Sequence, residues 1–284
     1  MLLFKHKNIK GLKFMSEYIK KQGISKFASF TKTKGKIDVF NEKQFHDYYE
    51  FYLLLNGKVD FLNEHLRTQI SPYTLVIIPP NEYHQFIVLD DVANYERFVL
   101  TVDSNLLEKG TIDSAVCGKE ILLLDKENRI VKNFFYLNSL LDNISNKDFA
   151  TVLQSIATDV IFLVKYLPKS EQVIKKSLSP LALKLMEYIS KHYAEDCSLK
   201  TLSKEFNFSV SLISHTFKKN FGISIKQFIQ QKLTAQINSD LKNGEKPEQL
   251  AYKYNFANYS TFYRAYKKRF GASPSTTKKS TLNK

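Results

Sequence analysis

Short apolar runs, separated by turn residues, dominate the chain from residue 25 to residue 102. The best-defined runs, rich in β-branched and aromatic residues, are 48–55, 58–62, 75–78 and 98–102. This pattern is typical of the strands of a sandwich or barrel. Asn56-Gly57 lies between the first two runs and predicts a two-residue hairpin, since Asn-Gly readily adopts the two positive φ angles of such a turn. Pro79-Pro80 ends the run at Ile78, because proline donates no ladder hydrogen bond.

From residue 128 to residue 167 the apolar positions recur every three or four residues, as in amphipathic helices. The two stripes comprise Ile130, Phe134, Leu137, Leu140, Leu141 and Ile144, and then Val152, Ile156, Val160, Leu163 and Leu167. We expect two antiparallel helices joined around residues 143–147. Packing against the barrel and forming an interface between two subunits are both compatible with this pattern, and one pair can do both.

The last third of the chain contains a repeat. The segment 217–222 recurs 49 residues later as 266–271, and the similarity extends upstream. Each copy predicts two helices joined by a sharp turn, over residues 199–221 and 247–270. Asn207 and Asn255 occupy the turns, where a residue that tolerates the left-handed conformation is needed. The expected helix starts are marked by Ser198, Ser209, Pro247 and Asn258.

The second helix of each copy has two distinct faces. Apolar residues at helical spacing predict a core face made of Ile213, Phe217, Phe221, Phe262, Tyr266 and Phe270. The opposite face is polar and basic in both copies, with Ser211, Ser214, His215, Lys218 and Lys219 matching Ser260, Tyr263, Arg264, Lys267 and Lys268 at an offset of 49. Residues 225–241 predict a helix that holds the two copies apart.

Net charge divides the chain at residue 168. Residues 168–284 contain 21 Lys and Arg and 8 Asp and Glu, a net charge of +13, whereas residues 1–167 contain 21 and 20, a net charge of +1. A charge excess confined to one segment indicates a polyanion-binding domain attached to a neutral one. We therefore predict domains over 1–167 and 180–284 with a linker over 168–179.

The polar faces suit double-stranded DNA. Residues near the start of each second helix can reach base edges in the major groove, and Arg264 suits guanine through its bidentate fork. The expected base-reading residues are Ser211, Ser214, His215, Ser260, Thr261, Tyr263 and Arg264. The expected phosphate contacts are Ser209, Lys218, Lys219, Lys267 and Lys268.

The N-terminal half contains one candidate ligand site. His46, Tyr48, Glu50 and Tyr52 alternate along one predicted strand face, and His84 begins a later strand. His46, Tyr48, Glu50 and His84 are candidates for lining an effector pocket in the barrel. Two histidines and a carboxylate can also hold a divalent metal, but such trios arise readily by chance, so we expect no metal and no cofactor.

Cysteine usage and hydropathy bear on location. Cys117 and Cys197 stand 80 residues apart, outside any CxxC pattern, so we expect neither a disulfide scaffold nor a thiolate zinc site. Lys5, Lys7, Lys10 and Lys13 interrupt any apolar run near the start of the chain, and we expect no membrane-spanning helix and a cytoplasmic location.

These C-terminal motifs resemble those of the AraC/XylS transcription regulators over about residues 180–278. The resemblance rests on Asn255-Phe256, Ser260, Phe262, Arg264, Tyr266-Lys267, Phe270-Gly271 and Pro274. The N-terminal half is similar to the cupin-type sensor domain of that family, although Tyr73 stands where glycine is common. The resemblance implies an α+β chain of two domains, a cupin-like β-barrel with a helix pair and an all-α domain with two helix-turn-helix units.

The resemblance also implies a function. We expect a homodimeric, effector-responsive activator that binds promoter DNA and RNA polymerase and is not an enzyme. Two alternatives remain open. One is a cupin-like metalloenzyme with a basic accessory domain, and the other is a DNA-binding regulator whose N-terminal domain only dimerises.

Overall fold

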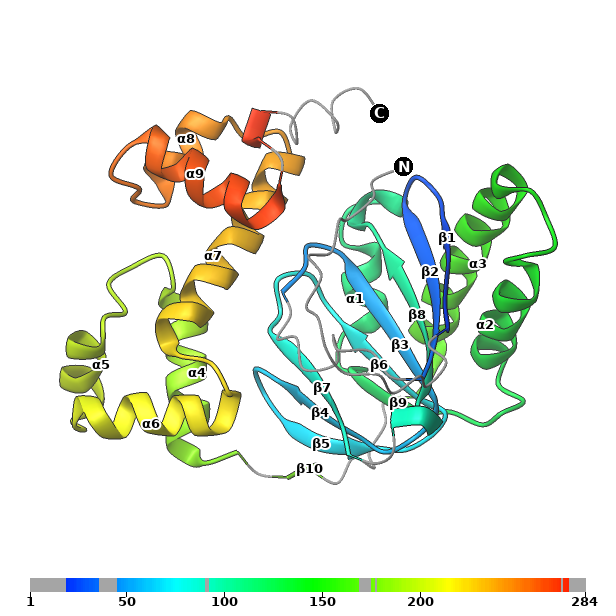
Figure 1. Cartoon of the computed structure of the whole chain (residues 1–284), viewed down its shortest axis with the longest axis horizontal. Helices are drawn as coiled ribbons and strands as arrows, with labels where there is room; N and C mark the ends of the chain where they lie inside the picture. The colour runs from blue at the N-terminus through cyan, green and yellow to red at the C-terminus, as the bar shows by residue number, and fades with distance from the viewer. Residues whose placement is uncertain are drawn as a thin grey trace, which may run out of the picture.

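The chain forms a β-rich N-terminal domain and a helical C-terminal domain (Figure 1). The computed structural model describes residues 19–35, 45–89, 92–168, 175–176, 178–271 and 273–275. This arrangement confirms the predicted α+β class.

Two antiparallel sheets make up the N-terminal domain. The larger sheet has the order β1-β2-β8-β3-β6-β9, with strands β1 (Ile19–Ile24), β2 (Ala28–Lys34), β8 (Glu96–Val102), β3 (Tyr49–Asn56), β6 (Thr74–Ile78) and β9 (Ile121–Leu123). The smaller sheet has the order β10-β5-β4-β7, with strands β10 (Lys175–Lys176), β5 (Arg67–Ile70), β4 (Val59–Asn63) and β7 (His84–Val88). Short 3-10 helices, Val92–Asn94 and Ser104–Leu106, flank β8.

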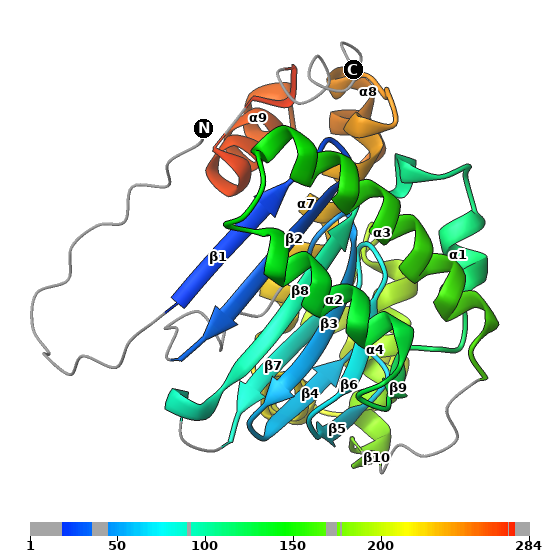
Figure 2. The ribbon, with the colours of Figure 1, turned by 90° about the vertical axis from the view of Figure 1, so that its right-hand side faces the viewer.

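The two sheets face each other across an aromatic core, in which the rings of Tyr52 and Phe86 stack at 3.8 Å. The other face of the larger sheet is covered by α1 (Thr111–Val116), α2 (Arg129–Leu140) and α3 (Asn146–Tyr166), as Figure 2 shows for α2 and α3. The predicted helix pair is therefore present and packs on the sheet. At Gly23 a Cβ atom would lie 2.1 Å from the Phe149 ring, so a glycine lets β1 approach α3.

Helix α3 is long and apolar enough to cross a membrane by length and composition. Its residues Phe149, Leu153, Val160 and Val164 are nevertheless buried in the core beneath the larger sheet. One face of α3 therefore packs against the larger sheet, while Phe162 and Tyr166 on the rest of its surface are exposed.

The predicted hairpin at Asn56-Gly57 is wrong. Strand β3 pairs with β6 and β8, whereas β4 pairs with β5 and β7, so the chain turns a corner from one sheet into the other. Gly57 has a φ of +103°, but Asn56 is not among the residues of positive φ. A primed hairpin turn needs positive φ at both central residues.

The range of strands is also wider than predicted. Strand β1 begins before residue 25, while β9 and β10 lie beyond residue 102. Strand β10 falls within the predicted linker 168–179 and pairs with β5. Residues 169–174 and 177 of that linker lie outside the described residues.

Tyr73 adopts the left-handed conformation, with a φ of +65°. Its amide donates to the Leu54 carbonyl at 2.7 Å, and its carbonyl accepts from the Leu124 amide at 3.0 Å. These two bonds hold the turn before β6 between neighbouring segments, and the positive φ is a conformation that glycine adopts more readily than tyrosine.

The C-terminal domain consists of six helices among the residues described. They are α4 (Pro180–His192), α5 (Leu199–Phe206), α6 (Val210–Phe221), α7 (Ile225–Lys242), α8 (Pro247–Lys253) and α9 (Tyr259–Phe270). Helix α7 starts at a capping box between Ser224 and Gln227, and it connects two separate hydrophobic clusters. The expected helix over 225–241 is thus confirmed, whereas α4 was not predicted.

Candidate nucleic-acid interface and sensor site

The first helix-turn-helix unit comprises α5 and α6. Asn207 ends α5 in the left-handed conformation, with φ 55° and ψ 39°. Ser209 then caps α6, its hydroxyl accepting from the Leu212 amide at 3.2 Å. Ser198 caps α5 in the same way. The predicted turn and caps are therefore confirmed, and they fix the angle at which α6 leaves α5.

The second unit, α8 and α9, reaches the same geometry with other residues. Pro247 occupies the first turn of α8, Asn255 has a φ of 54°, and Asn258 caps α9 by accepting from the Thr261 amide at 2.9 Å. Thr261 also donates its hydroxyl to Asn258 at 3.0 Å. The hydroxyl of Thr261, a predicted base-reading residue, is therefore already hydrogen-bonded to the cap.

The apolar faces of α6 and α9 are buried as predicted. Ile213, Phe217 and Phe221 have no exposed surface, and Phe262 and Tyr266 are buried in the second cluster. The side chain of Phe270 lies outside the described residues.

The predicted DNA-facing residues lie on the opposite, accessible faces. Ser209, Ser211, His215, Lys218 and Lys219 are exposed in the first unit, as are Ser260, Thr261, Arg264, Lys267 and Lys268 in the second, while Ser214 and Tyr263 are half-buried. Arg264 donates from Nε to the Ser260 carbonyl at 3.3 Å. Whether these residues contact DNA stays a prediction.

Helix α7 sets the separation of the two units. It has 18 residues, a length of about 27 Å at about 1.5 Å per residue. Ser214 of α6 and Ala265 of α9 line one cleft of about 640 Å³ that runs along α7. The two exposed helices therefore border a common cleft, an arrangement compatible with successive segments of one groove.

The helical domain docks on the N-terminal domain through an aromatic cluster. The ring of Phe45 lies 5.3 Å from that of Phe228 on α7 and 5.5 Å from that of Tyr83. Tyr83, which has no exposed surface, donates its hydroxyl to the carbonyl of Phe221 at 2.7 Å. The core of the first helix-turn-helix unit is thus continuous with the N-terminal domain.

Two ion pairs also join the domains, and the one between Glu64 and Lys232 is largely buried. Both carboxylate oxygens of Glu64 accept from Lys232 of α7, at 2.8 and 2.9 Å, and Ser190 of α4 donates to the same group. Asp47 accepts from Asn238 at 2.6 Å and pairs with Lys242 at 2.7 Å. Buried charges in contact with partners of this kind fix one docking geometry, because losing either partner leaves the other charge unpaired.

A second link runs through Asn238 of α7 to α9, the second helix of the second helix-turn-helix unit. The Asn238 side chain accepts a short hydrogen bond from the hydroxyl of Tyr266 on α9 while it donates to Asp47. Asp47 is therefore joined through one side chain to the second helix-turn-helix unit.

The candidate sensor residues converge beside this interface. His46, Glu50 and His84 each offer a ligand atom, and these atoms lie within 4.8 Å of one another. All three side chains are buried. Tyr48 is half-buried and its ring stacks on His46 at 4.1 Å. His46 and Tyr48 precede β3 rather than lying on it, so the predicted common strand face holds only for Glu50 and Tyr52.

The charges of this trio are set by burial and by its neighbours. Burial alone would raise the pKa of Glu50, but the imidazoles of His46 and His84 and the guanidinium of Arg97 outweigh it and lower the pKa to about 2. Burial and the neighbouring His46 lower the pKa of His84 to about 4. Near neutral pH, Glu50 is thus a carboxylate and His84 a neutral imidazole.

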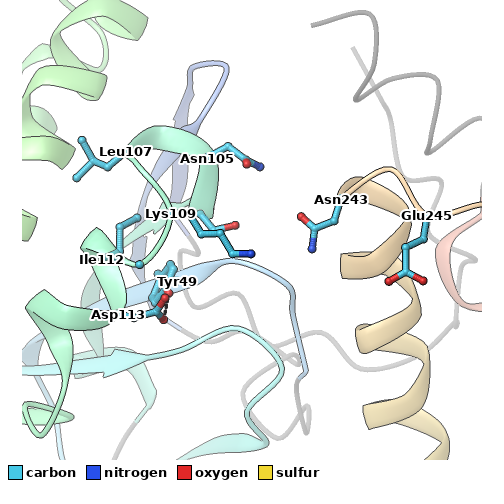
Figure 3. Close-up of a pocket in the computed structure, with 10 residues that line it drawn as sticks. Tyr49, Asn105, Leu107, Lys109, Ile112, Asp113, Asn243 and Glu245 are labelled. Carbon is cyan, nitrogen blue, oxygen red and sulfur yellow. Dashed lines mark hydrogen bonds between the residues drawn. The ribbon is translucent and has the colours of Figure 1, made fainter.

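A polar cleft of about 550 Å³ separates the two domains near the end of α7. Lys109, Tyr49 and Asp113 line one wall, and Asn243 and Glu245 line the other (Figure 3). Tyr49 donates its hydroxyl to Asp113 within that wall. The sequence did not indicate this cleft, because its two walls are more than 100 residues apart in the chain.

The interdomain contacts were missed for the same reason. Phe45, Asp47, Glu64 and Tyr83 carry no local pattern that distinguishes them from other barrel residues. Their position in the sequence is the only feature that could have pointed to an interdomain contact. Phe45 and Asp47 flank His46, and Tyr83 precedes His84.

Fold and site together define a two-domain protein with a double helix-turn-helix DNA-binding region. Residues 33–134 match the family of AraC-like ligand binding domains, and residues 202–280 match a family of helix-turn-helix domains. The chain belongs to the AraC family of transcription regulators.

Individual relatives are distant. The uncharacterized HTH-type transcriptional regulator YdiP of Escherichia coli is 26% identical over 55% of this chain and 53% of its own length, so the match spans about half of that relative. The virulence regulon transcriptional activator VirF of Yersinia enterocolitica is 21% identical over 79% of this chain and 86% of its own. The solved structure of ToxT from Vibrio cholerae covers 92% of this chain and 97% of its own, with 16% identity and a TM-score of 0.37.

Proposed function

We propose that this protein is a sequence-specific, double-stranded DNA-binding regulator that activates transcription in response to an effector. The observation that carries the proposal is the repeat itself. Two helix-turn-helix units, each with an exposed polar and basic helix face, border one cleft along α7. A single basic helix is common on protein surfaces, but two in matching register behind the same left-handed turn are expected of a groove-binding protein.

Several finer features belong to the same proposal. The domains extend over 1–167 and 180–284, and the effector acts at the interior of the N-terminal domain, near His46, Tyr48, Glu50 and His84. The protein works in the cytoplasm as a homodimer, with RNA polymerase as its partner during activation. VirF, the activator of a virulence regulon, supports the choice of activation.

Docking of the two domains supports control by an effector. An effector shifts the DNA-bound population only when it binds one domain arrangement better than another. Tyr83 and Asp47 connect the N-terminal domain to both helix-turn-helix units, so a change at either residue alters the position of a recognition helix.

Genome-wide mapping of DNA bound by the protein tests this function. We expect a small set of promoter sites that share one motif, and we expect purified protein to bind those sites in preference to shuffled sequence. Uniform binding of both would contradict sequence-specific regulation. A variant with Arg264→Ala, Lys267→Ala and Lys268→Ala serves as a binding-deficient control.

A further inference from the structure

We propose that His46, Glu50 and His84 bind one divalent transition-metal ion, and that occupancy of this site controls how the DNA-binding domain docks. All three metal ligands belong to the N-terminal domain, so metal binding does not depend on the proposed function. Control of domain docking by the metal does rest on the proposed function. The proposal departs from the sequence-based expectation of no metal, because the structure adds the arrangement of the donor atoms.

The two imidazoles present matching nitrogens. Nδ1 of His46 lies 2.8 Å from the Tyr48 carbonyl, and Nδ1 of His84 lies 3.2 Å from the Glu82 carbonyl. A carbonyl oxygen only accepts, so each Nδ1 must donate, and each neutral ring then carries its lone pair on Nε2. Metal-binding histidines are typically oriented in this way, with the second ring nitrogen held by a carbonyl or carboxylate.

Both Nε2 atoms are buried and form no hydrogen bond among the residues described. Nε2 of His46 lies 3.3 Å from a carboxylate oxygen of Glu50. In the absence of a metal, a protonated His46 would form an ion pair with Glu50 at this distance. Such a pair leaves Nε2 of His84 without a partner in a side chain that has no exposed surface. A buried polar atom without a partner destabilises the fold, and a bound cation would offset that cost.

The chemistry of the donors selects the class of ion. Imidazole nitrogens suit zinc, iron, copper and nickel, whereas magnesium and calcium prefer sites made of oxygen atoms. The positive charge of Arg97 already stabilises the Glu50 carboxylate and would repel a second cation. A cation bound only by electrostatic attraction to Glu50 is therefore disfavoured. An ion that gains from two nitrogen bonds is therefore favoured, and two histidines with one carboxylate form a recognised catalytic or sensory donor set for zinc and iron.

Aromatic rings lie next to the two histidines of the trio. The ring of Tyr48 stacks on His46, the His84 ring lies 4.8 Å from that of His46, and the Phe86 ring lies 6.0 Å from His84. Aromatic rings thus enclose the donors. Bonds of about 2.0–2.2 Å require the donor atoms to approach one another to roughly 3.5 Å. Binding must therefore draw the three donor atoms closer together than their present separations, which reach 4.8 Å.

Each imidazole adjoins a different contact with the DNA-binding domain. His84 follows Tyr83, which donates to the Phe221 carbonyl at the end of α6. His46 precedes Asp47, which is bound by Asn238 and through it to Tyr266 of α9. A metal that draws His46 and His84 toward Glu50 would displace Tyr83, which contacts α6 directly, and Asp47, which is linked to α9 through Asn238.

The first experiment measures metal binding in the absence of DNA. Full-length protein is stripped with a chelator, dialysed and titrated with Zn²⁺ by calorimetry. We expect one equivalent per chain, and His84→Gln and Glu50→Gln should weaken binding by more than about 100-fold, since loss of an outer partner alone costs about 10- to 100-fold. The exposed His65 provides a matched control, and His65→Gln should bind as the wild type does. No stoichiometric binding, or binding retained in both cluster variants, overturns the site.

A spectroscopic measurement covers variants that fail to fold. Co²⁺ substituted into wild-type protein should give the absorption of a nitrogen- and oxygen-coordinated ion without thiolate charge-transfer bands. Thiolate bands would assign the metal to Cys117 or Cys197 and overturn the proposal.

The second experiment measures coupling on the mapped promoter DNA by fluorescence anisotropy, with Zn²⁺ or with chelator. We expect the wild-type Kd to change by a factor of about 5–150, the usual range of allosteric coupling. His84→Gln should show no change and His65→Gln the full change. An equal Kd in both conditions overturns the regulatory step, while loss of all DNA binding would instead contradict the proposed function and leave the metal titration standing.

Discussion

The phenol of Tyr83 donates a 2.7 Å hydrogen bond to the backbone carbonyl of Phe221, the last residue of the first recognition helix. Both residues lack exposed surface, and the bond joins the two domains. Tyr83→Phe keeps the aromatic ring but leaves the Phe221 carbonyl unsatisfied, so we expect a loss of about 1–3 kcal/mol in the free energy of unfolding. Urea denaturation measures it.

Tyr252 provides the control for that substitution, because its side chain is 88% exposed. Tyr252→Phe should change the free energy of unfolding by less than about 0.5 kcal/mol. If both variants unfold alike, the Tyr83 bond does not hold the domains together.

Arg264 is expected to read a base. Arg264→Ala should cost about 1–3 kcal/mol at a cognate promoter, with little loss on random DNA, because a bidentate contact to guanine discriminates against other bases. Anisotropy titrations against both DNAs measure the difference. An equal loss on both would reduce Arg264 to a phosphate contact. Arg264→Lys should rescue only a non-specific role, since lysine lacks the planar fork.

Lys267 and Lys268 are expected to bind phosphates. Their joint replacement by alanine should weaken binding to all DNA about equally and lower the slope of log K against log salt concentration by roughly 2, or about 0.9 for each lost contact. Lys147, an exposed residue of the N-terminal domain, is the control. An unchanged slope in the double variant would remove both residues from the interface.

The helical domain was predictable because its determinants are local. Asn207 and Asn255 occupy turns that require the left-handed conformation, and Ser209 and Asn258 supply the caps next to them. Each of these residues lies within a few positions of the turn or helix end that it specifies. The repeat provides the same evidence in both helix-turn-helix units.

The N-terminal sheets were less predictable, since strand pairing depends on distant residues. Asn56-Gly57 carries the local signature of a hairpin, yet the flanking strands join different sheets, β3 pairing with β6 and β8 and β4 with β5 and β7. His46 and His84 were recognised as candidate ligands from their residue type and from their expected places on or beside two strands. Their convergence with Glu50 depends on the path of a chain that no local pattern encodes.

Asn207 is expected to be the conformational determinant of the first turn. Asn207→Ala should cost about 1–2 kcal/mol in the free energy of unfolding, since a Cβ without a polar group disfavours positive φ. Asn207→Gly should be more stable than the alanine variant by about 1 kcal/mol. Equal stability of the two variants, measured by urea denaturation, would show that φ of 55° does not limit this position.

The two cysteines should differ sharply in reactivity. Cys117 is exposed, whereas Cys197 is buried and donates from Sγ to the His192 carbonyl at 3.3 Å. Burial, with the neighbouring carboxylates of Glu195 and Asp196, raises the pKa of Cys197 to about 11. At pH 8 its thiolate is then only about one part in a thousand, and the thiolate is the reactive form.

A disulfide-exchange reagent should therefore label one thiol rapidly in native protein and the second only after denaturation. Cys117→Ser should abolish the rapid reaction, and Cys197→Ser should leave it intact. Cys197 immediately precedes Ser198, the cap of α5, so its protection also means that mild thiol reagents should leave DNA binding by the first helix-turn-helix unit unchanged. Two rapidly reacting thiols would show that the α4–α5 segment opens readily in solution.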